Sequence, residues 1–274
     1  MGIVQPPSPV HQPSSKDKLT YTDHTPRQSP SVFPKDLSMT RIAIITGASS
    51  GIGAATAEHF LQQGFSVINL SRRPCPVSGV ENHCGDLATS DAVTALAQGL
   101  VSAVKTAQPS EVCLIHNAAL MLKDNAENCT DDSFERAFHI NVSAINTLNR
   151  HLIPVMPKGS SIQFIGSTLS EKAVGGAFSY VVTKHAQLGM MRATTQDLMG
   201  RGIHTALICP GFTDTEMLRG HVGNDETILA DISKMNSFGR LIDPNEIARL
   251  VIWSHHNPVI NGSVLHANLG QLEH

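Results

Sequence analysis

Short apolar runs alternate with longer stretches of helix-favouring residues along the chain from about residue 41. The runs are rich in Val, Ile and Leu and have the length of buried parallel strands. They lie at residues 41–46, 65–70, 82–87, 111–116, 161–166, 203–209 and 263–266. Strands that alternate with helices in this way predict an α/β fold of Rossmann type, a doubly wound parallel sheet of about seven strands with helices on both faces.

The helices are placed by capping residues and by the spacing of apolar positions. Thr130 is followed by two aspartates, and Asp243 is followed by a proline and then by an acid at its third position, so both predict helix starts. The predicted helices run over residues 54–63, from Thr89 or Ser90 to about 105, from Thr130 to about 150, over 178–199 and from Asp243 to about 254.

A glycine-rich turn follows the first predicted strand. Its sequence, Gly47-Ala-Ser-Ser-Gly-Ile-Gly53, leads directly into a predicted helix. Missing side chains let the backbone approach a pyrophosphate, and the helix N-terminus offers N–H groups and a favourable dipole. Such turns also occur for steric reasons alone, but the strand–turn–helix–strand context favours a dinucleotide site. The predicted contacts are Gly47, Ser49, Ser50, Gly51 and Ile52.

The residues after the second strand bear on the choice of dinucleotide. A site for NAD usually has an Asp or Glu about 20 residues after the glycines, which accepts hydrogen bonds from the ribose hydroxyls. Here no carboxylate lies between Gly64 and Pro74, and Arg72 and Arg73 follow the strand instead. Guanidinium groups suit a phosphate on the ribose 2′ position, so we predict NADP(H) over NAD(H), with Arg72 as a contact. The alternative is that both arginines are solvated loop residues.

A tyrosine and a lysine four residues apart predict acid–base chemistry. Tyr180 and Lys184 share one face of the helix predicted over residues 178–199. Ser167 comes directly after the strand that precedes this helix. A phenol loses its proton near pH 10, and a neighbouring ammonium is expected to lower the pKa of Tyr180 toward the useful range. Such pairs also occur on helix surfaces without function, so the catalytic interpretation depends on the rest of the chain.

Composition and charge argue against several other classes of function. The chain has 274 residues, enough for one large domain, and a net charge of −3, which gives no electrostatic case for binding nucleic acid or an anionic membrane. No apolar run reaches the ~18 residues of a membrane span. The five cysteines form no C-x-x-C pair and the 14 histidines form no ligand array. We therefore expect reduced thiols, no metal site and a cytoplasmic protein.

The first 38 residues differ from the rest of the chain. They hold seven of its 15 prolines, and they predict a disordered N-terminal extension before a domain at residues 39–274. The segment lacks the apolar stretch of a secretory signal, and its single arginine and several aspartates argue against a mitochondrial transit peptide. Met39 stands just before the first strand, so a start-site artefact and a genuine tail both fit the sequence.

With these motifs in order, residues 41–270 resemble the short-chain dehydrogenase/reductase family in its compact single-domain form. The resemblance implies that Tyr180 is the acid/base, that Ser167 holds the substrate oxygen and that Lys184 contacts the nicotinamide ribose. It also implies that Asn141 holds a water in a proton relay toward Lys184, unless its side chain only bonds back to its own helix. The matching segments are Thr46-Gly-Ala-Ser-Ser-Gly-Ile-Gly53, Asp86-Leu87, Asn117-Ala-Ala119, Asn141, Ser167, Tyr180-x-x-x-Lys184 and Pro210-Gly211-x-x-x-Thr215.

The resemblance also implies further cofactor contacts. Asp86 and Leu87 are expected beside the adenine, with the alternative that Asp86 only caps the following loop. Asn117 is expected on the adenosine side of the cofactor, and Pro210 and Thr215 complete the predicted contacts, with Thr215 near the nicotinamide. Two segments depart from the family pattern: Ala stands at 119 where Gly is common, and Asn268-Leu269-Gly270 replaces a glycine pair. The end of the last strand is therefore expected to have a different shape.

The expected activity is hydride transfer between NADP(H) and a carbonyl or secondary alcohol of a small molecule, in a homodimer or homotetramer. Residues 212–238 are expected to form a flap over the active site, whose helix-spaced apolar positions 228, 229, 232 and 235 predict one buried face. They do not select among ketones, sugars, acyl thioesters and polycyclic substrates. The alternatives are a non-catalytic dinucleotide-sensing regulator on the same fold and a sugar-nucleotide epimerase, which would need a longer C-terminal domain.

Overall fold

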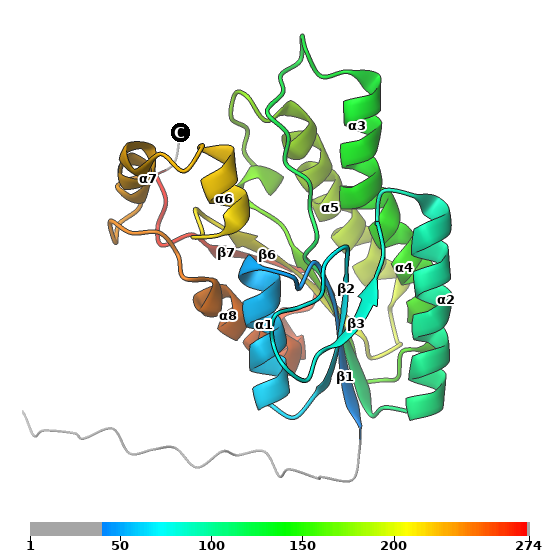
Figure 1. Ribbon diagram of the computed structural model, residues 1–274. Coiled ribbons are helices and arrows are strands. Elements are labelled where there is room, and N and C mark those ends of the chain that lie inside the picture. The colour runs from blue at the N-terminus through cyan, green and yellow to red at the C-terminus, as the bar shows by residue number, and fades with distance from the viewer. Residues whose placement is uncertain (1–39, 273–274) are drawn as a thin grey trace, which may run out of the picture. The chain divides into compact units, whose positions relative to one another are not determined.

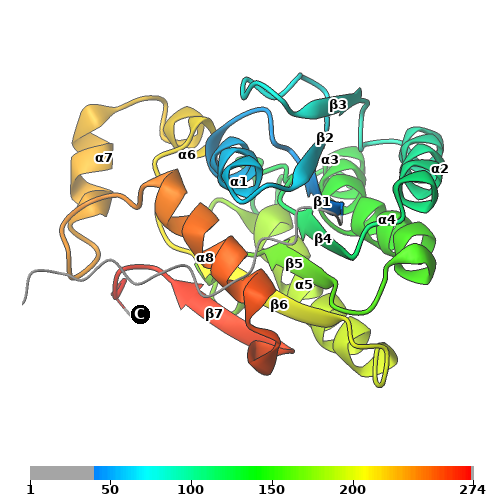
Figure 2. The ribbon, with the colours of Figure 1, turned by 90° about the horizontal axis from the view of Figure 1, so that it is seen from below.

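Seven parallel strands form one sheet, in the order β3-β2-β1-β4-β5-β6-β7 (Figures 1 and 2). The structure is a computed structural model that describes residues 40–272, so the predicted disorder of residues 1–38 lies outside it. The predicted Rossmann-type sheet of about seven strands is confirmed. The strands are β1 Arg41–Thr46, β2 Ser66–Ser71, β3 Glu81–Cys84, β4 Glu111–His116, β5 Ser161–Ile165, β6 His204–Pro210 and β7 Ser263–Ala267.

Helices cover both faces of this sheet. α1 (Gly51–Gln62) and α8 (Pro244–His256) pack together on one face. The other face is covered by α2, α4 and α5, which are Ser90–Ala107, Ala144–Leu152 and Phe178–Asp197. The remaining helices are α3 (Asp131–Phe138), which precedes α4, and α6 (Glu216–His221) and α7 (Glu226–Ser233), which lie beyond the carboxyl ends of the strands in Figure 1.

The central strands are apolar throughout because both faces of the sheet are covered. In β1, Ile42 and Ile44 pack toward α2, α4 and α5, whereas Ala43 and Ile45 pack toward α1 and α8. None of these four side chains is more than 3% exposed. This explains why the sequence shows short continuous apolar runs rather than an alternation of polar and apolar residues.

Two elements end differently from the prediction. The third strand ends at Cys84 rather than at residue 87, because Asp86 accepts a hydrogen bond from the N–H of Ala88 at 3.0 Å and turns the chain. The helix predicted from Thr130 to about residue 150 is divided, since His139–Ser143 form a π-helical turn between α3 and α4. Single π turns inside helices are frequent at functional sites, and this one contains Asn141.

The strand order places a ligand crevice between β1 and β4. From β1 the chain continues to β2 and β3 on one side of the sheet, and from β4 it continues to β5, β6 and β7 on the other. In a doubly wound sheet, the crevice at the carboxyl ends of such a strand pair binds the ligand. The segments that begin there are the glycine-rich turn after Thr46 and the loop that starts at Asn117.

Candidate active site

The glycine-rich turn forms a tight junction between β1 and α1. Gly47 has a φ of +73°, a left-handed conformation that favours glycine. A Cβ at Gly53 would lie 2.3 Å from the Gly47 carbonyl oxygen, so α1 packs directly on the turn. The N-cap residue Ser50 makes no side-chain capping bond, and the first turn of α1 holds no acidic residue. The N–H groups at the start of α1 therefore fit the pyrophosphate of a dinucleotide.

Polar groups at the end of β4 hold this turn in place. The side-chain amide of Asn117 donates to the carbonyl oxygens of Thr46 and Gly47, both at 3.0 Å. In return, Thr46 Oγ1 accepts the backbone N–H groups of Asn117 and Ala118 at 2.9 and 3.0 Å. Asn117, which was predicted to contact the adenosine side of the cofactor, thus stabilises the glycine-rich turn through its own side chain.

Asn69 was not predicted as a site residue, yet it connects the glycine-rich turn to the segment after β2. It is completely buried. Its Oδ1 accepts the N–H of Ala48 at 3.0 Å, and its Nδ2 donates to Asn82 Oδ1 at 2.9 Å. Asn82 Oδ1 also accepts the N–H of Cys75 at 2.7 Å. The signal in the sequence was a polar residue inside an apolar run, since a buried amide requires partners.

Arg72 and Arg73 follow β2 at the carboxyl edge of the sheet, and both are exposed. Arg73 pairs with Glu216 of α6 at 3.0 Å, whereas Arg72 makes no ion pair within residues 40–272. Of the two residues predicted beside the adenine, Asp86 is exposed and its Oδ1 accepts the N–H of Ala88, and its contact with adenine stays a prediction. Leu87 is 6% exposed, and its side chain belongs to the core beside α2.

The structure brings Ser167, Tyr180 and Lys184 together at this edge. Tyr180 and Lys184 lie in the first two turns of α5 and are 8% and 2% exposed. The Ser167 side chain lies near the Tyr180 hydroxyl group and favours its ionised form. Lys184 Nζ lies 5.4 Å from the centroid of the Tyr180 ring and donates to the Ile165 carbonyl at 2.7 Å and to Gln187 Oε1 at 3.1 Å.

Burial controls the protonation of the Tyr180–Lys184 pair. Burial raises the pKa of Tyr180 to about 12, and the nearby Ser167 side chain opposes this only in part. Burial also lowers the pKa of Lys184 to about 8. The expected net lowering of the Tyr180 pKa is therefore wrong for this structure, because desolvation of the phenol outweighs the groups that favour its ionised form. At pH 7 Tyr180 carries its proton and Lys184 carries its charge.

Asn141 is completely buried in the π-helical turn. Its Oδ1 accepts the N–H of Leu120 at 2.7 Å, and its Nδ2 donates to Leu120 O and to Thr183 Oγ1, both at 2.9 Å. The side chain therefore does not bond back to its own helix, and that alternative is wrong. The backbone carbonyl of Asn141 accepts Gln187 Nε2 at 2.7 Å. Gln187 is 1% exposed and was not predicted as a site residue.

The segment after β6 borders the glycine-rich turn. Pro210 ends β6, and Thr215 caps α6 through its hydroxyl group. A Cβ at Gly51 would lie 3.0 Å from Thr215 Cγ2, so the start of the flap adjoins the predicted phosphate site. The predicted buried face of the flap is wrong in part, because Leu229 of α7 is buried but Ile228 is 43% exposed.

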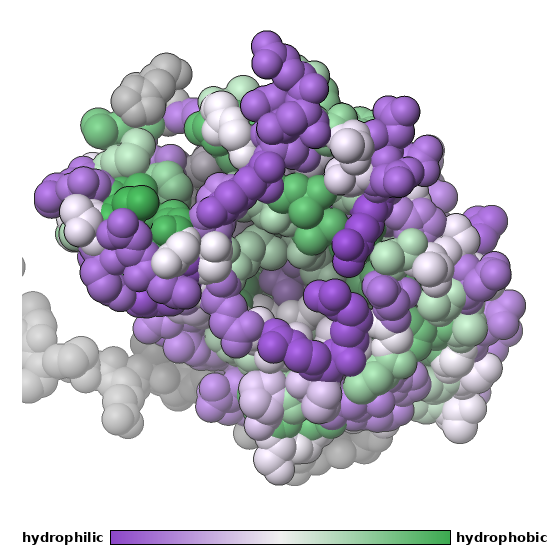
Figure 3. Space-filling model, turned by 45° about the horizontal axis from the view of Figure 1, so that its top comes forward, coloured by the Kyte–Doolittle hydropathy of each residue, from purple (hydrophilic) through white to green (hydrophobic). Residues whose placement is uncertain are grey.

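The carboxyl edge of the sheet is hollowed, with apolar and neutral residues inside a largely polar rim (Figure 3). One cavity of about 310 Å³ is lined by residues of the segment 123–128, by Gly175 and Gly176, and by His221 of α6. Asp124 in its wall accepts the N–H of Ser179 at 3.1 Å. This cavity therefore lies at the start of α5, beside the turn that carries Tyr180.

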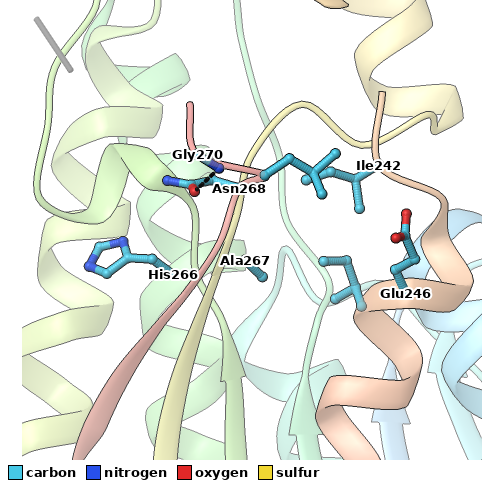
Figure 4. Close-up of a pocket in the computed structure, with 8 residues that line it drawn as sticks. Ile242, Glu246, His266, Ala267, Asn268 and Gly270 are labelled. Atoms are coloured by element: carbon cyan, nitrogen blue, oxygen red, sulfur yellow. Dashed lines mark hydrogen bonds between the residues drawn. The ribbon is translucent and has the colours of Figure 1, made fainter. Parts of the chain in front are cut away.

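A second cavity of about 220 Å³ lies between the end of β7 and the start of α8 (Figure 4). None of the predicted site residues lines it. The chain departs from the family's glycine pair here: Leu269 and Gly270 have φ values of +55° and +66°, and the Gly270 N–H donates to Asn268 Oδ1 at 3.1 Å. Two successive left-handed residues thus shape the end of the last strand.

Residues 40–272 contain neither a metal-binding cluster nor a membrane-spanning helix. No group of three or more His, Cys, Asp or Glu side chains there is arranged to hold a metal ion. In the same part of the chain, every helix is too short or too polar to span a bilayer. All five cysteines are free thiols.

The sheet order, the glycine-rich turn at its crevice and the buried Tyr180–Lys184 pair define a class of Rossmann-type dinucleotide-binding proteins. A family model described as enoyl-(acyl carrier protein) reductase matches residues 47–271, which is most of the chain. The chain belongs to the short-chain dehydrogenase/reductase family, a family of oxidoreductases, as its motifs predicted.

Relatives of this chain include enzymes with different substrates. It is 26% identical to the 3-oxoacyl-(acyl-carrier-protein) reductase of Vibrio harveyi over 240 residues, which cover 84% of this chain and 96% of that protein. It is 29% identical to the 2-keto-3-deoxy-L-fuconate dehydrogenase of Xanthomonas campestris, covering 77% of this chain and 72% of that protein. Among solved structures, the aldohexose dehydrogenase of Thermoplasma acidophilum superposes with a TM-score of 0.77 at 26% identity, covering 85% of this chain and 94% of that one.

Proposed function

We propose that this protein is an NADP(H)-dependent oxidoreductase that interconverts a carbonyl group and a secondary alcohol, with Tyr180 as the acid/base. One observation supports the proposal above the others: the half-buried Ser167 and the buried Tyr180 and Lys184 lie at the same edge of the sheet as the glycine-rich turn. The glycine-rich turn would hold the pyrophosphate of the dinucleotide, and Tyr180 and Lys184 would lie on the nicotinamide side of the same edge. The names of the relatives, which are reductases and dehydrogenases, support the same reaction class.

The bound nicotinamide supplies the hydride for reduction of a carbonyl carbon, or accepts it in the reverse direction. In the reduction, Tyr180 donates its hydroxyl proton to the carbonyl oxygen. Ser167 Oγ donates a hydrogen bond to the same oxygen, where negative charge develops. The Lys184 ammonium then stabilises the tyrosinate that remains, because an opposite charge a few ångströms away favours the ionised phenol.

The proposal of NADP(H) depends on Arg72. This residue is exposed directly after β2, and no carboxylate stands between Gly64 and Pro74 to receive the ribose hydroxyls of NAD(H). The fold itself accommodates either cofactor: a 3-oxoacyl-(acyl-carrier-protein) reductase from Agrobacterium tumefaciens was solved with NADP, and a 4-hydroxyisoleucine dehydrogenase was solved with NADH. A guanidinium at position 72 favours the 2′-phosphate.

A fluorescence titration with NADPH and with NADH tests the cofactor proposal. We expect NADPH to bind at least about tenfold more tightly, since a charge-assisted contact contributes about 1.5–3 kcal/mol. Arg72→Ala is expected to lose this advantage and to leave NADH binding unchanged. Arg192→Ala, on the exposed side of α5, is the matched control for the loss of one positive charge. Equal affinity for the two cofactors in the wild-type protein would contradict the proposal.

Turnover of a panel of carbonyl compounds with NADPH tests the role of Tyr180. Tyr180→Phe is expected to lose about 10²- to 10⁴-fold in kcat while it keeps its affinity for NADPH, because only the proton donor is removed. Near-normal turnover of this variant would exclude Tyr180 as the acid/base. Tight NADPH binding by the wild-type protein with no turnover across the panel would favour the dinucleotide-sensing regulator instead.

A further inference from the structure

The Lys184 ammonium and the Asn141 carbonyl are joined by one side chain. Gln187 lies one turn after Lys184 on α5, and its Oε1 accepts a hydrogen bond from Lys184 Nζ at 3.1 Å. Its Nε2 donates to the Asn141 carbonyl at 2.7 Å. The oxygen and the nitrogen of the Gln187 amide are therefore both hydrogen-bonded. Both side chains are buried, since Lys184 is 2% and Gln187 is 1% exposed.

Asn141 is itself fixed, so the bridge has a rigid end. The Asn141 side chain makes three hydrogen bonds, two with Leu120 and one with Thr183 of α5. Asn141 lies in a π-helical turn, whose hydrogen-bond register differs from that of an α-helix. The backbone carbonyl of Asn141 accepts the hydrogen bond from the Gln187 amide. The result is a network from the α3–α4 junction through Gln187 to Lys184.

An amide bridge differs chemically from a bridging water. A side-chain amide donates only through nitrogen and accepts only through oxygen, whereas a water does both through one atom. Gln187 therefore presents a fixed acceptor to Lys184 and does not pass a proton onward at neutral pH. It orients the ammonium and favours its charged form, because a hydrogen bond that is donated by the charged form stabilises that form.

We propose that Gln187 is a positioning residue of this site, which holds the Lys184 ammonium at a fixed place beside the Tyr180 ring by bridging it to the Asn141 carbonyl. The inference rests on the proposed function, in which Lys184 acts together with Tyr180. It adds a buried residue that acts only through Lys184.

The other titratable groups that face Lys184 are few. Tyr180 faces it from the same helix and Cys209 faces it from β6, with Glu171 beyond Cys209. The Ile165 carbonyl of β5, which accepts the second hydrogen bond of Nζ, does not titrate. A substitution at residue 187 leaves all of these groups in place, so a change in the titration of Lys184 reports on the bridge.

The test is an NMR titration of the full chain labelled with [ε-¹³C]lysine, in which Lys184→Met assigns the Lys184 signal. Gln187→Met keeps the length of the side chain but removes the acceptor, and we expect the midpoint of Lys184 to fall by about one pH unit. Gln187→Glu places a carboxylate beside Nζ, and we expect the midpoint to rise by about one unit or more. Gln196→Met, at an exposed position of the same helix, is expected to leave the midpoint unchanged.

Opposite shifts in the Met and Glu variants support the bridge, since a general loss of packing would move both variants in one direction. Equal midpoints in the wild-type protein and both variants would overturn it. If Gln187→Met does not fold, the Glu variant alone decides, because it keeps both the size and the polarity of the side chain. In the turnover assay, the pH dependence of kcat is expected to follow the NMR midpoint.

The titration needs neither substrate nor cofactor. A wild-type protein that turns over no carbonyl compound would therefore count against the proposed function, while the NMR midpoints still decide whether Gln187 bridges Lys184. A wild-type protein that is active, with a pH dependence that neither Gln187 variant changes, would count against the bridge alone.

Discussion

Gly53 has an ordinary backbone conformation, so its backbone angles do not require a glycine. Close packing around this position excludes any side chain. A Cβ there would lie 2.3 Å from the Gly47 carbonyl oxygen and 2.5 Å from the Asn117 side-chain nitrogen. Both groups belong to the junction that the predicted pyrophosphate site is built on. The sequence motif includes Gly53 in the glycine-rich turn, and the packing of α1 on that turn explains why a glycine is needed there.

Gly53→Ala is expected to abolish NADPH binding and to destabilise the protein by several kcal/mol, because the turn and α1 must separate. The control is Gly189→Ala in α5, where a Cβ would meet no atom within 4 Å. This variant is expected to raise the free energy of unfolding by about 0.5–1 kcal/mol, since alanine favours a helix over glycine. Urea unfolding and an NADPH titration of both variants check the prediction, which fails if Gly53→Ala binds normally.

Lys184 illustrates at the residue scale what a buried charge does to stability. Its pKa is lowered from 10.5 to about 8 by burial, so between these values the unfolded chain binds the proton and the folded chain does not. The free energy of unfolding contributed by Lys184 therefore rises with pH across this window. Tyr180, whose pKa burial raises to about 12, has the opposite sign at higher pH.

We expect the difference in unfolding free energy between the wild-type protein and Lys184→Met to rise by about 2 kcal/mol from pH 7 to pH 9.5. The comparison uses the pH slope of the difference, so constant effects of the substitution cancel, and Tyr180 is present in both proteins. Urea unfolding at pH 7, 8.5 and 9.5 measures it. If the unfolding free energies of the two proteins change with pH in parallel, Lys184 is not desolvated in the way that the structure shows.

At the scale of elements, the start of α5 depends on a residue from another segment. The N-cap residue Ala177 has no side chain that could cap the helix. Asp124 serves instead: its Oδ1 accepts the N–H of Ser179 at 3.1 Å and its carbonyl accepts the N–H of Phe178 at 3.2 Å. Burial by itself raises the pKa of Asp124, but the hydrogen bonds from this helix start outweigh it and lower the pKa. The first turn of α5, which carries Tyr180, is therefore fixed by the loop after β4.

Asp124→Ala is expected to cost about 1–2 kcal/mol of stability, as the loss of a helix cap does, and to increase hydrogen exchange in the first turn of α5. Asp124→Asn keeps an oxygen acceptor and is expected to lose less. The lowered pKa of Asp124 also predicts how stability depends on pH. The contribution of Asp124 to the free energy of unfolding is present above the pKa of the unfolded chain and is lost as the pH falls through the folded pKa. The Asn variant should lack that acid-dependent loss, and unchanged exchange in the Ala variant would contradict the capping role.

Element boundaries were predicted well where a local signal marks them. The helix starts at Thr130 and Asp243 are confirmed, because each side chain caps nearby N–H groups. The break between α3 and α4 was missed, because the sequence from His139 to Ser143 contains neither Gly nor Pro. The π-helical turn there is associated with contacts of Asn141 to Leu120 and Gln187, which lie outside any local window.

At the scale of the whole molecule, large apolar side chains remain exposed, as they do at surfaces that pair with another chain. Val259 is 89% and Trp253 is 48% exposed beside the end of α8, and Phe178 is 38% exposed at the start of α5. We expect a homodimer or homotetramer in solution, and static light scattering measures its mass. Trp253 is the only tryptophan, so dilution to the monomer should shift its emission if this surface is covered. A monomer at working concentration would contradict the prediction.

The sequence by itself determined the order of strands and helices, the glycine-rich turn and the spacing of Tyr180 and Lys184. These features are periodicities and short motifs, so they are encoded by neighbouring residues. Only the tertiary structure decided the protonation of that pair, the capping of α5 by Asp124 and the bridge from Lys184 to Asn141. Asp124 is 55 residues from Ser179, and Gln187 is 46 residues from Asn141. Desolvation and hydrogen-bond partners depend on which distant residues fold together, and no local pattern specifies them.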